Sequence, residues 1–145
     1  MLSDLGSKAE EYFRKGYNGA EALAKAIAEM YQIDYKWASN IATPFGGGLG
    51  GKGSICGCLA GGMIGIGYLY GRTDAEDKEK KTLAYEKAKL FYERFMDKFG
   101  TVSCRELCGM DLSTEEGREQ FEKENIRGKC AEYVRESGNM LADIL

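Results

Sequence analysis

The stretch Pro44–Gly71 constrains the fold of this chain more than any other. It opens with a loop that holds six glycines in Gly46–Gly53, and the segment Ile55–Tyr70 that follows has no charged residue. Glycine at this density indicates backbone in conformations that other residues resist, or backbone close to a neighbour. The charge-free segment is shorter than the ~20 apolar residues that a membrane-spanning helix needs. It therefore predicts a central helix that is buried on all sides.

Capping residues and apolar spacing predict helices over most of the remaining chain. Asn18 and Asp34 are expected to cap two of them, and Pro44 is expected to end the second. Further starts are expected at Ser7, Thr73, Ser103 and Ser113, with glycine breaks at Gly71, Gly100 and Gly128 and with Cys130 leading the last helix. No segment alternates with period two for long. The sequence therefore predicts an all-α, single compact domain over residues 1–145, with roughly six to eight helices around a buried glycine-rich central helix.

Two helix faces can be assigned in more detail. Gly57, Gly61 and Gly65 recur every four residues on the central helix and predict a bare face on which another helix packs closely. In the long charged helix that follows, five apolar residues are expected to face inward: Leu83, Leu90, Phe91, Phe95 and Phe99.

Charge and cysteine content exclude several functional classes. The net charge of -3 argues against a general nucleic-acid-binding protein. The N-terminus lacks the basic-then-apolar pattern of a secretory signal, so a cytoplasmic location is expected. Histidine is absent, which excludes His-ligated haem, His-ligated zinc and Cys–His nucleophile pairs. Five cysteines, an odd number, do not suggest a disulfide framework and are expected to be reduced, metal-bound or redox-active.

Cysteines at helix starts carry the main chemical signal. With Ser54 as the expected N-cap, Cys56 lies in the first turn of the central helix, and Cys104 directly follows the cap at Ser103. Unpaired backbone N–H groups and the helix dipole favour an anion there, so a lowered thiol pKa is expected at both cysteines. Thiolate is both a metal ligand and a redox nucleophile. The competing interpretation is that the cysteines are small, inert core residues, and no Cys-x2-Cys spacing of zinc or ferredoxin sites is present.

The glycine loop matches or nearly matches two nucleotide-binding sequence motifs, but the structural context that these motifs need is absent. Gly46-x-Gly48-x-x-Gly51 fits the dinucleotide fingerprint, and Gly46 to Lys52 nearly fits a P-loop. No strand precedes either motif, and Gly53 stands where a P-loop needs a hydroxyl. The loop is therefore expected to provide a tight backbone path. Gly46, Gly47 and Gly48 are candidate cofactor contacts, because their N–H groups could hydrogen-bond sulfur or an anion.

Several blocks of the sequence together resemble a known family. They are Gly16-Tyr17-Asn18, Phe45-Gly46-Gly47-Gly48, Cys56-Gly57-Cys58-Leu59-Ala60-Gly61, Cys104-Arg105-Glu106-Leu107 and Cys130. With these blocks the chain is similar, nearly end to end, to the redox-active proteins named for a C-GCAxxG-C-C cysteine pattern. That family is related to the cysteine-rich domain of split-Soret cytochromes. Haem is not implied here, because histidine ligands and Cys-x-x-Cys-His are absent.

The resemblance implies four cysteines, and this chain departs from that set. Glycine stands at Gly19 in place of the first cysteine, and extra thiols occur at Cys58 and Cys108, where the resemblance implies alanine and an apolar residue. The expected site is Cys56, Cys104, Cys130 and either Cys58 or Cys108, or three thiolates with an open position. Cys108 is preferred over Cys58, since positions 56 and 58 of one helix would point to nearly opposite sides, whereas Cys104 and Cys108 share a face. The alternative is that Cys56 lies on the loop, where Cys56 and Cys58 could ligate together.

Three functions follow as hypotheses. The first is an iron–sulfur cluster held by the cysteines, for electron transfer or redox sensing with a redox partner protein of unknown identity. The second is a metal-free thiol/disulfide oxidoreductase, with Cys56 or Cys104 as the attacking thiolate and Cys58 or Cys108 beside it. The third is a helical interaction module whose cysteines are inert or bind zinc. Neither nucleic-acid binding nor membrane insertion is expected, and enzymatic activity and homo-oligomerisation are left open.

Overall fold

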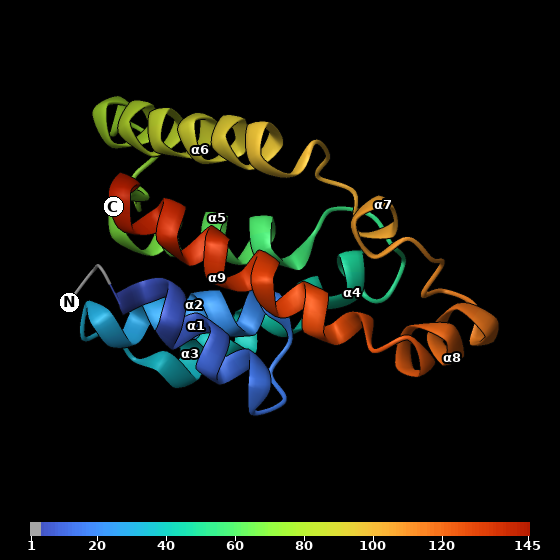
Figure 1. The fold of residues 1–145 in the computed structure, drawn as a ribbon. Coiled ribbons are helices and arrows are strands. Elements are labelled where there is room, and N and C mark those ends of the chain that lie inside the picture. The colour runs from blue at the N-terminus through green and yellow to red at the C-terminus, as the bar shows by residue number, and fades with distance from the viewer. Residues whose placement is uncertain (1–3) are drawn as a thin grey trace.

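The computed structural model describes residues 4–145, which form a helical body without β-strands in that range. The helices are α1 (Leu5–Arg14), α2 (Gly19–Met30), α3 (Tyr35–Ala42), α5 (Gly57–Tyr70), α6 (Lys78–Phe99), α7 (Cys104–Cys108), α8 (Glu115–Lys123) and α9 (Ile126–Ile144). A 3-10 turn, η2 (Thr43–Phe45), and a glycine turn, α4 (Gly46–Leu49), connect α3 to the loop before α5. The all-α prediction is confirmed (Figure 1).

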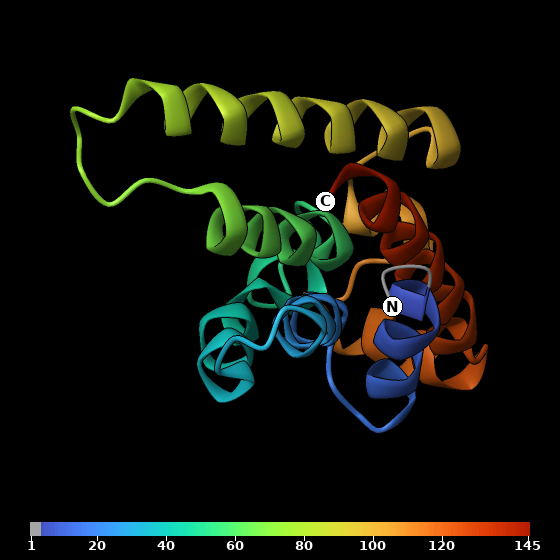
Figure 2. The ribbon, with the colours of Figure 1, turned by 90° about the vertical axis from the view of Figure 1, so that its left-hand side faces the viewer.

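Helix α5 is the central element, as the sequence predicts, but it is not buried on all sides, because Gly67 is exposed and Tyr68, Leu69 and Tyr70 are only half-buried. It lies between α2 and α6, and the long helix α6 crosses over it and extends beyond the body (Figure 2). Helices α1 and α9 pack along each other beside this stack, and α9 also contacts α2, α5 and α6. None of the helices within residues 4–145 is both long and apolar enough to cross a bilayer.

The glycine stripe of α5 lets α2 approach to backbone contact. A Cβ atom at Gly61 would lie 2.5 Å from the carbonyl oxygen of Ala20, and one at Gly65 would lie 2.2 Å from the Ile27 side chain. On the opposite side, a Cβ at Gly62 would lie 2.3 Å from the ring of Phe91 on α6. The predicted close packing on the bare face is therefore confirmed, and α2 is the helix that fills it.

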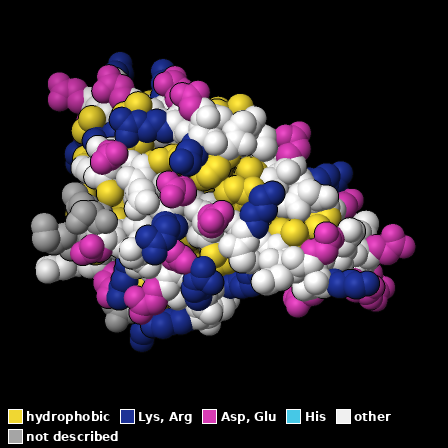
Figure 3. All heavy atoms as spheres, viewed as in Figure 1, with side chains coloured by type: hydrophobic (Ala, Val, Ile, Leu, Met, Phe, Trp, Pro, Cys, Tyr) yellow, Lys and Arg dark blue, Asp and Glu magenta, His cyan; other side chains and the backbone are white. Residues whose placement is uncertain are grey.

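The inward face of α6 is shorter than predicted. Phe91 and Phe95 are completely buried, and edge-to-face ring contacts continue from Phe95 to Phe99. Leu83 and Leu90, by contrast, are 41% and 38% exposed. The prediction for these two leucines is wrong. Leu83 lies in the first half of α6, which projects past α5 (Figure 2). Leu90 lies in the second half, but on a more exposed side of the helix than the adjacent Phe91. Elsewhere on the face in Figure 3, acidic and basic side chains are interspersed around exposed apolar ones.

Some predicted helix boundaries are confirmed and others shift. Asn18 forms a full capping box with Glu21, and Asp34 caps α3. The start predicted at Ser7 lies inside α1, Asp77 rather than Thr73 caps α6, and Thr114 rather than Ser113 caps α8. For α6 and α8, the observed cap is a nearby residue that is also a good N-cap type. Helix α1 begins earlier than predicted, and it packs along α9.

The last helix begins earlier than predicted. Asn125 takes a left-handed conformation with φ 52°, which separates α8 from α9. Helix α9 then runs through Gly128, where the sequence predicts a break, and Cys130 lies inside the helix rather than at its start. A single glycine costs a helix interior only about 1 kcal/mol, which the extensive packing of α9 against α1 outweighs.

Candidate thiol site

All five cysteines line one cavity of about 240 Å³. It lies at the end of the molecule where α4, α7 and the N-termini of α2 and α5 meet the first half of α9 (Figure 1). The thiols come from Cys56, Cys58, Cys104, Cys108 and Cys130, and each is free. Phe13, Leu107 and Val134 supply apolar walls. Three chain segments that are distant in sequence thus bring their sulfur atoms to a single volume.

The glycine loop shapes one wall of this cavity by folding on itself. Gly47 and Gly48 have φ values of 62° and 73°, which favour glycine. The N–H groups of Gly53 and Ser54 donate to the carbonyl oxygens of Gly47 and Gly48 at 3.0 and 2.8 Å. A Cβ at Gly48 would lie 2.7 Å from the Cβ of Cys104, so the bare backbone lets α7 approach.

The three glycines predicted as cofactor contacts have different surroundings. Gly47 lines the cavity. Gly46 packs against the Asn18 side chain, and its N–H donates to the Thr43 carbonyl oxygen, within the 3-10 turn. Gly48 lies against Cys104. Donation of an N–H group from this loop to sulfur stays a prediction, with Gly47 the best placed of the three.

Backbone hydrogen bonds hold Cys56 and Cys104 at the cavity. Cys56 N–H donates to the Val102 carbonyl oxygen at 2.7 Å, and Cys104 N–H donates to the Ser54 carbonyl oxygen at 2.6 Å. Between them, Ile55 and Ser103 form an isolated antiparallel bridge. We call this short ladder the 55–103 clasp. It joins the loop before α5 to the loop before α7.

Cys56 is itself the N-cap of α5, two residues after the predicted cap at Ser54. Its φ of -56° and ψ of 132° are not helical, whereas Cys58 lies in the first turn of the helix. The preference for Cys108 over Cys58 assumes that positions 56 and 58 are both helical. That assumption does not hold, so both sulfur atoms of the Cys-x-Cys pair can face the cavity.

Cys56 is stabilised as a thiolate by its own helix start. A hydrogen bond with the Cys58 thiol, together with the backbone N–H groups of Cys58 and Leu59, holds the pKa of Cys56 below its usual value despite burial. The same hydrogen bond, with burial, raises the pKa of Cys58 well above its usual value. The hydrogen bond between the two sulfur atoms thus favours the thiolate form of Cys56 over that of Cys58.

The lowered pKa that the sequence predicts for Cys104 is wrong. Burial, followed by the neighbouring Cys108 and Cys56, raises the pKa of Cys104 to about 12. Burial and then Cys56 likewise raise the pKa of Cys130 to about 12. Desolvation disfavours the charged form, and α7, with five residues, is too short for its terminus to offset this.

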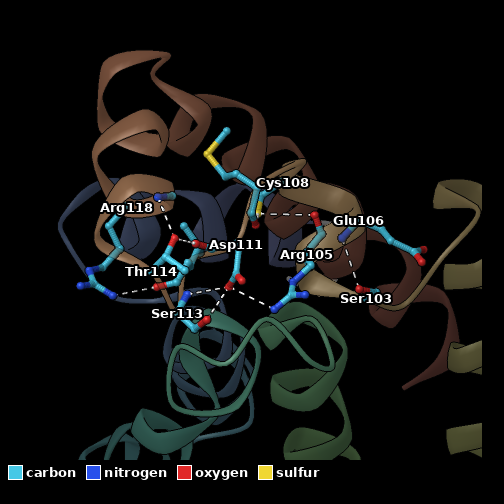
Figure 4. A network of polar contacts seen from close by, with 11 residues as sticks. Ser103, Arg105, Glu106, Cys108, Asp111, Ser113, Thr114 and Arg118 are labelled. Atoms are coloured by element: carbon cyan, nitrogen blue, oxygen red, sulfur yellow. Dashed lines mark hydrogen bonds and ion pairs between the residues drawn. The ribbon is translucent and has the colours of Figure 1, made fainter.

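Cys108 has polar partners outside the cavity. Its thiol donates to the carbonyl oxygen of Met110 at 3.2 Å. Figure 4 shows the network that fixes this segment, in which the Asp111 carboxylate receives the Arg105 guanidinium and the Ser113 N–H, both at 3.0 Å. The position of α7 is therefore fixed by polar contacts as well as by the 55–103 clasp.

Ser137 on α9 is a buried residue that the sequence does not single out. It is fully buried, and its hydroxyl makes no hydrogen bond of normal geometry with any residue in 4–145. It lies near enough to Cys58 to favour the Cys58 thiolate and so to oppose the rise of its pKa. A serine in an amphipathic helix carries no pattern that would mark it; only the packing of α9 against α5 reveals it.

No three His, Cys, Asp or Glu side chains in the part of the chain that the structure describes lie close enough together to hold one metal ion. The five sulfur atoms instead surround the cavity.

The comparison with protein families agrees with this site. Residues 17–144 match the sequence model of the family described as "Putative redox-active protein (C_GCAxxG_C_C)". The chain belongs to this family. No curated protein and no solved structure matched the chain. Membership in the C_GCAxxG_C_C family supports a redox role for this chain.

In this C_GCAxxG_C_C protein, alkylation of the metal-free thiols should follow pKa rather than exposure. At pH 8, a thiol with a pKa below 9 is at least about one-tenth ionised, and one at about 12 is ionised in about one molecule in ten thousand. After allowance for the greater nucleophilicity of high-pKa thiolates, Cys56 should react with iodoacetamide at least about tenfold faster than Cys104 or Cys130.

Site-resolved mass spectrometry of the alkylated protein measures this order. Cys104 and Cys130 are the more exposed cysteines, so exposure alone predicts the opposite result. Labelling in denaturant, where the five thiols should become equivalent, is the control. Faster labelling of Cys104 or Cys130 in the folded protein would show that Cys56 is not the stabilised thiolate.

Proposed function

We propose that this chain holds an iron–sulfur cluster in the five-thiol cavity and uses it for electron transfer or redox sensing with a protein partner. The observation that carries the proposal is the convergence of five free thiols on one cavity in a chain without histidine. Cysteine thiolates are the usual ligands of such clusters. A cluster also distributes its ligands over several irons, so its thiolates surround a volume rather than a point.

The donor set fits the group. Cys56, Cys104 and Cys130 are the ligands that the family pattern implies, and Cys58 or Cys108 would complete a set of four. When bound, the cluster would supply one-electron chemistry. The protein's own contribution is to keep the ligands in place through the 55–103 clasp, to exclude water with Phe13, Leu107 and Val134, and to donate hydrogen bonds at the sulfur of Cys56. Hydrogen bonds to ligating sulfur and burial are the factors that set a cluster's potential.

The deciding experiment is anaerobic purification followed by a visible absorption spectrum and by iron and acid-labile sulfide analysis. The expected result is brown protein with iron and sulfide in comparable amounts, bleached by reductant. Protein that remains colourless after anaerobic reconstitution with iron and sulfide would overturn the proposal. Zinc in the elemental analysis, without sulfide, would point instead to a structural metal site.

A second candidate function is supported by the Cys56–Cys58 pair. The pKa of Cys56 is held below its usual value, and its hydrogen-bond donor is another cysteine. In a metal-free dithiol reaction, the Cys56 thiolate would attack a substrate disulfide and release one substrate thiolate. A neighbouring thiol would then attack the Cys56 sulfur and release the second, so that two electrons pass to the substrate.

Thiol counting separates this function from the first. Mild oxidation of metal-free protein should remove two thiols as one defined pair that includes Cys56, and a dithiol should restore them. Random pairing, or no loss of thiols, would argue against it.

A further inference from the structure

Gly19 and Cys58 compete for the same space. A Cβ atom at Gly19 would lie 3.1 Å from the sulfur of Cys58 and 3.6 Å from the Val134 side chain. Gly19 is the first residue of α2, directly after the Asn18 cap, and both Gly19 and Cys58 line the five-thiol cavity. The sulfur of Cys58 therefore occupies the position into which a side chain at residue 19 would extend.

The distance of 3.1 Å between a Cβ at Gly19 and the Cys58 sulfur is also that of a disulfide-bonded pair. Across a disulfide with an S–S bond near 2.05 Å, the Cβ of one cysteine lies about 3 Å from the sulfur of the other. A thiol introduced at position 19 would thus be within bonding reach of Cys58. Because residue 19 is glycine, the Cys58 sulfur has no side chain of residue 19 beside it.

We propose that Cys58 supplies to the cavity the thiol that position 19 lacks, so that the fourth cluster ligand comes from the first turn of α5 instead of the first residue of α2. The proposal rests on the proposed iron–sulfur function for the ligand role, and on geometry alone for the equivalence of the two positions. It departs from the preference for Cys108, whose thiol already donates to the Met110 carbonyl oxygen.

Ser137 supplies a hydrogen-bond donor beside this place. Its completely buried hydroxyl lacks a partner of normal geometry among residues 4–145 and lies beside Cys58. Burying a hydroxyl without a hydrogen bond is costly. A ligating sulfur at Cys58 would provide an acceptor for this hydroxyl, and hydrogen bonds to ligating groups are a usual feature of metal sites.

The first test moves the thiol. Anaerobic reconstitution is carried out on wild type, Cys58→Ala, Cys108→Ala, the double variant Gly19→Cys/Cys58→Ala and the matched control Gly67→Cys/Cys58→Ala. Gly67 lies on α5, and a Cβ there would have no neighbour within 4 Å. The control therefore has the same composition, with its added thiol away from the cavity. The readouts are iron and sulfide per chain and the visible spectrum.

The expected result is that Cys58→Ala lowers iron per chain at least about threefold more than Cys108→Ala does. Gly19→Cys/Cys58→Ala should restore iron, and the Gly67 control should not. Full iron in Cys58→Ala, or equal rescue by both double variants, would overturn the inference. So would failure of a folded Gly19→Cys/Cys58→Ala variant to regain iron.

The second test needs no metal and separates failure of this inference from failure of the proposed function. Metal-free Gly19→Cys protein, with all five native cysteines, is oxidised mildly, and its disulfides are mapped by mass spectrometry. The introduced thiol should pair predominantly with Cys58. If it pairs mainly with another cysteine or stays free, the two positions are not equivalent and the inference fails even where wild type binds iron. If wild type binds no iron, this cross-link alone decides the geometric claim.

Discussion

Gly61→Ala should lower the free energy of unfolding by about 3 kcal/mol, at the upper end of the usual cost of overpacking. The added Cβ would lie 2.5 Å from the carbonyl oxygen and 2.7 Å from the Cα of Ala20. These are backbone atoms of α2, so no side-chain rotation can relieve the contact and the two helices must separate. Urea unfolding followed by circular dichroism measures the change.

Gly67→Ala is the matched control, on the same helix. Its Cβ would have no neighbour within 4 Å. Replacing a helical glycine by alanine then removes only the entropic cost of glycine and should raise the free energy of unfolding by about 1 kcal/mol. A Gly61→Ala variant as stable as wild type, or a Gly67→Ala variant equally destabilised, would contradict the assignment of the α2–α5 contact. Because the N-terminus of α2 also borders the cavity, Gly61→Ala should alter the thiol site as well.

Cys56→Ala should lower iron binding after anaerobic reconstitution by at least about tenfold, because even second-shell changes at metal sites cost 10–100-fold. Cys56 accepts hydrogen bonds from the Cys58 thiol and from two backbone N–H groups, which lower its pKa and so favour the thiolate that a metal binds. It is also fixed by the clasp through its own N–H group. The readouts are iron and sulfide per chain.

Ile55→Ala provides the control for Cys56→Ala. Ile55 is the preceding residue in the same bridge, but its side chain is 41% exposed and does not line the cavity. The variant should keep its iron, since its backbone bridge to Ser103 needs no side chain. If Cys56→Ala retains most of its iron and is folded by circular dichroism, Cys56 is not a ligand and the donor set must be revised.

The sequence predicts those parts of the fold that depend on local chemistry. The caps at Asn18 and Asp34, the end of α3 just before Pro44 and the bare face of Gly57, Gly61 and Gly65 are all found in the structure. Each depends on a residue type whose conformational or steric property acts within its own segment. The grouping of cysteines at the starts of α5 and α7 is also visible in the sequence and predicts a thiol site.

What the sequence does not predict depends on burial. A helix N-terminus favours thiolate in general, but the buried surroundings of Cys104 reverse that effect. Leu83 is exposed because the start of α6 extends past α5. Helical periodicity shows which face of α6 is apolar, but not how much of its length has a neighbouring helix to pack against. The proximity of Cys58 to Gly19 likewise depends on how α2 packs against α5. Two residues so far apart in the sequence carry no local signal that they are neighbours.

The 55–103 clasp is built entirely from main-chain atoms. Its bonds join Cys56 to Val102 and Cys104 to Ser54 through N–H and carbonyl groups that every residue except proline at the donor positions would provide. The hydrogen bonds that space these two sulfurs therefore do not depend on the side chains of the four residues that they join, although Gly48 must stay bare for α7 to approach. Replacing a thiol outside these four residues, such as Cys58 or Cys108, should therefore leave the clasp hydrogen bonds in place. A site of this construction can change its ligands one at a time without rebuilding its walls.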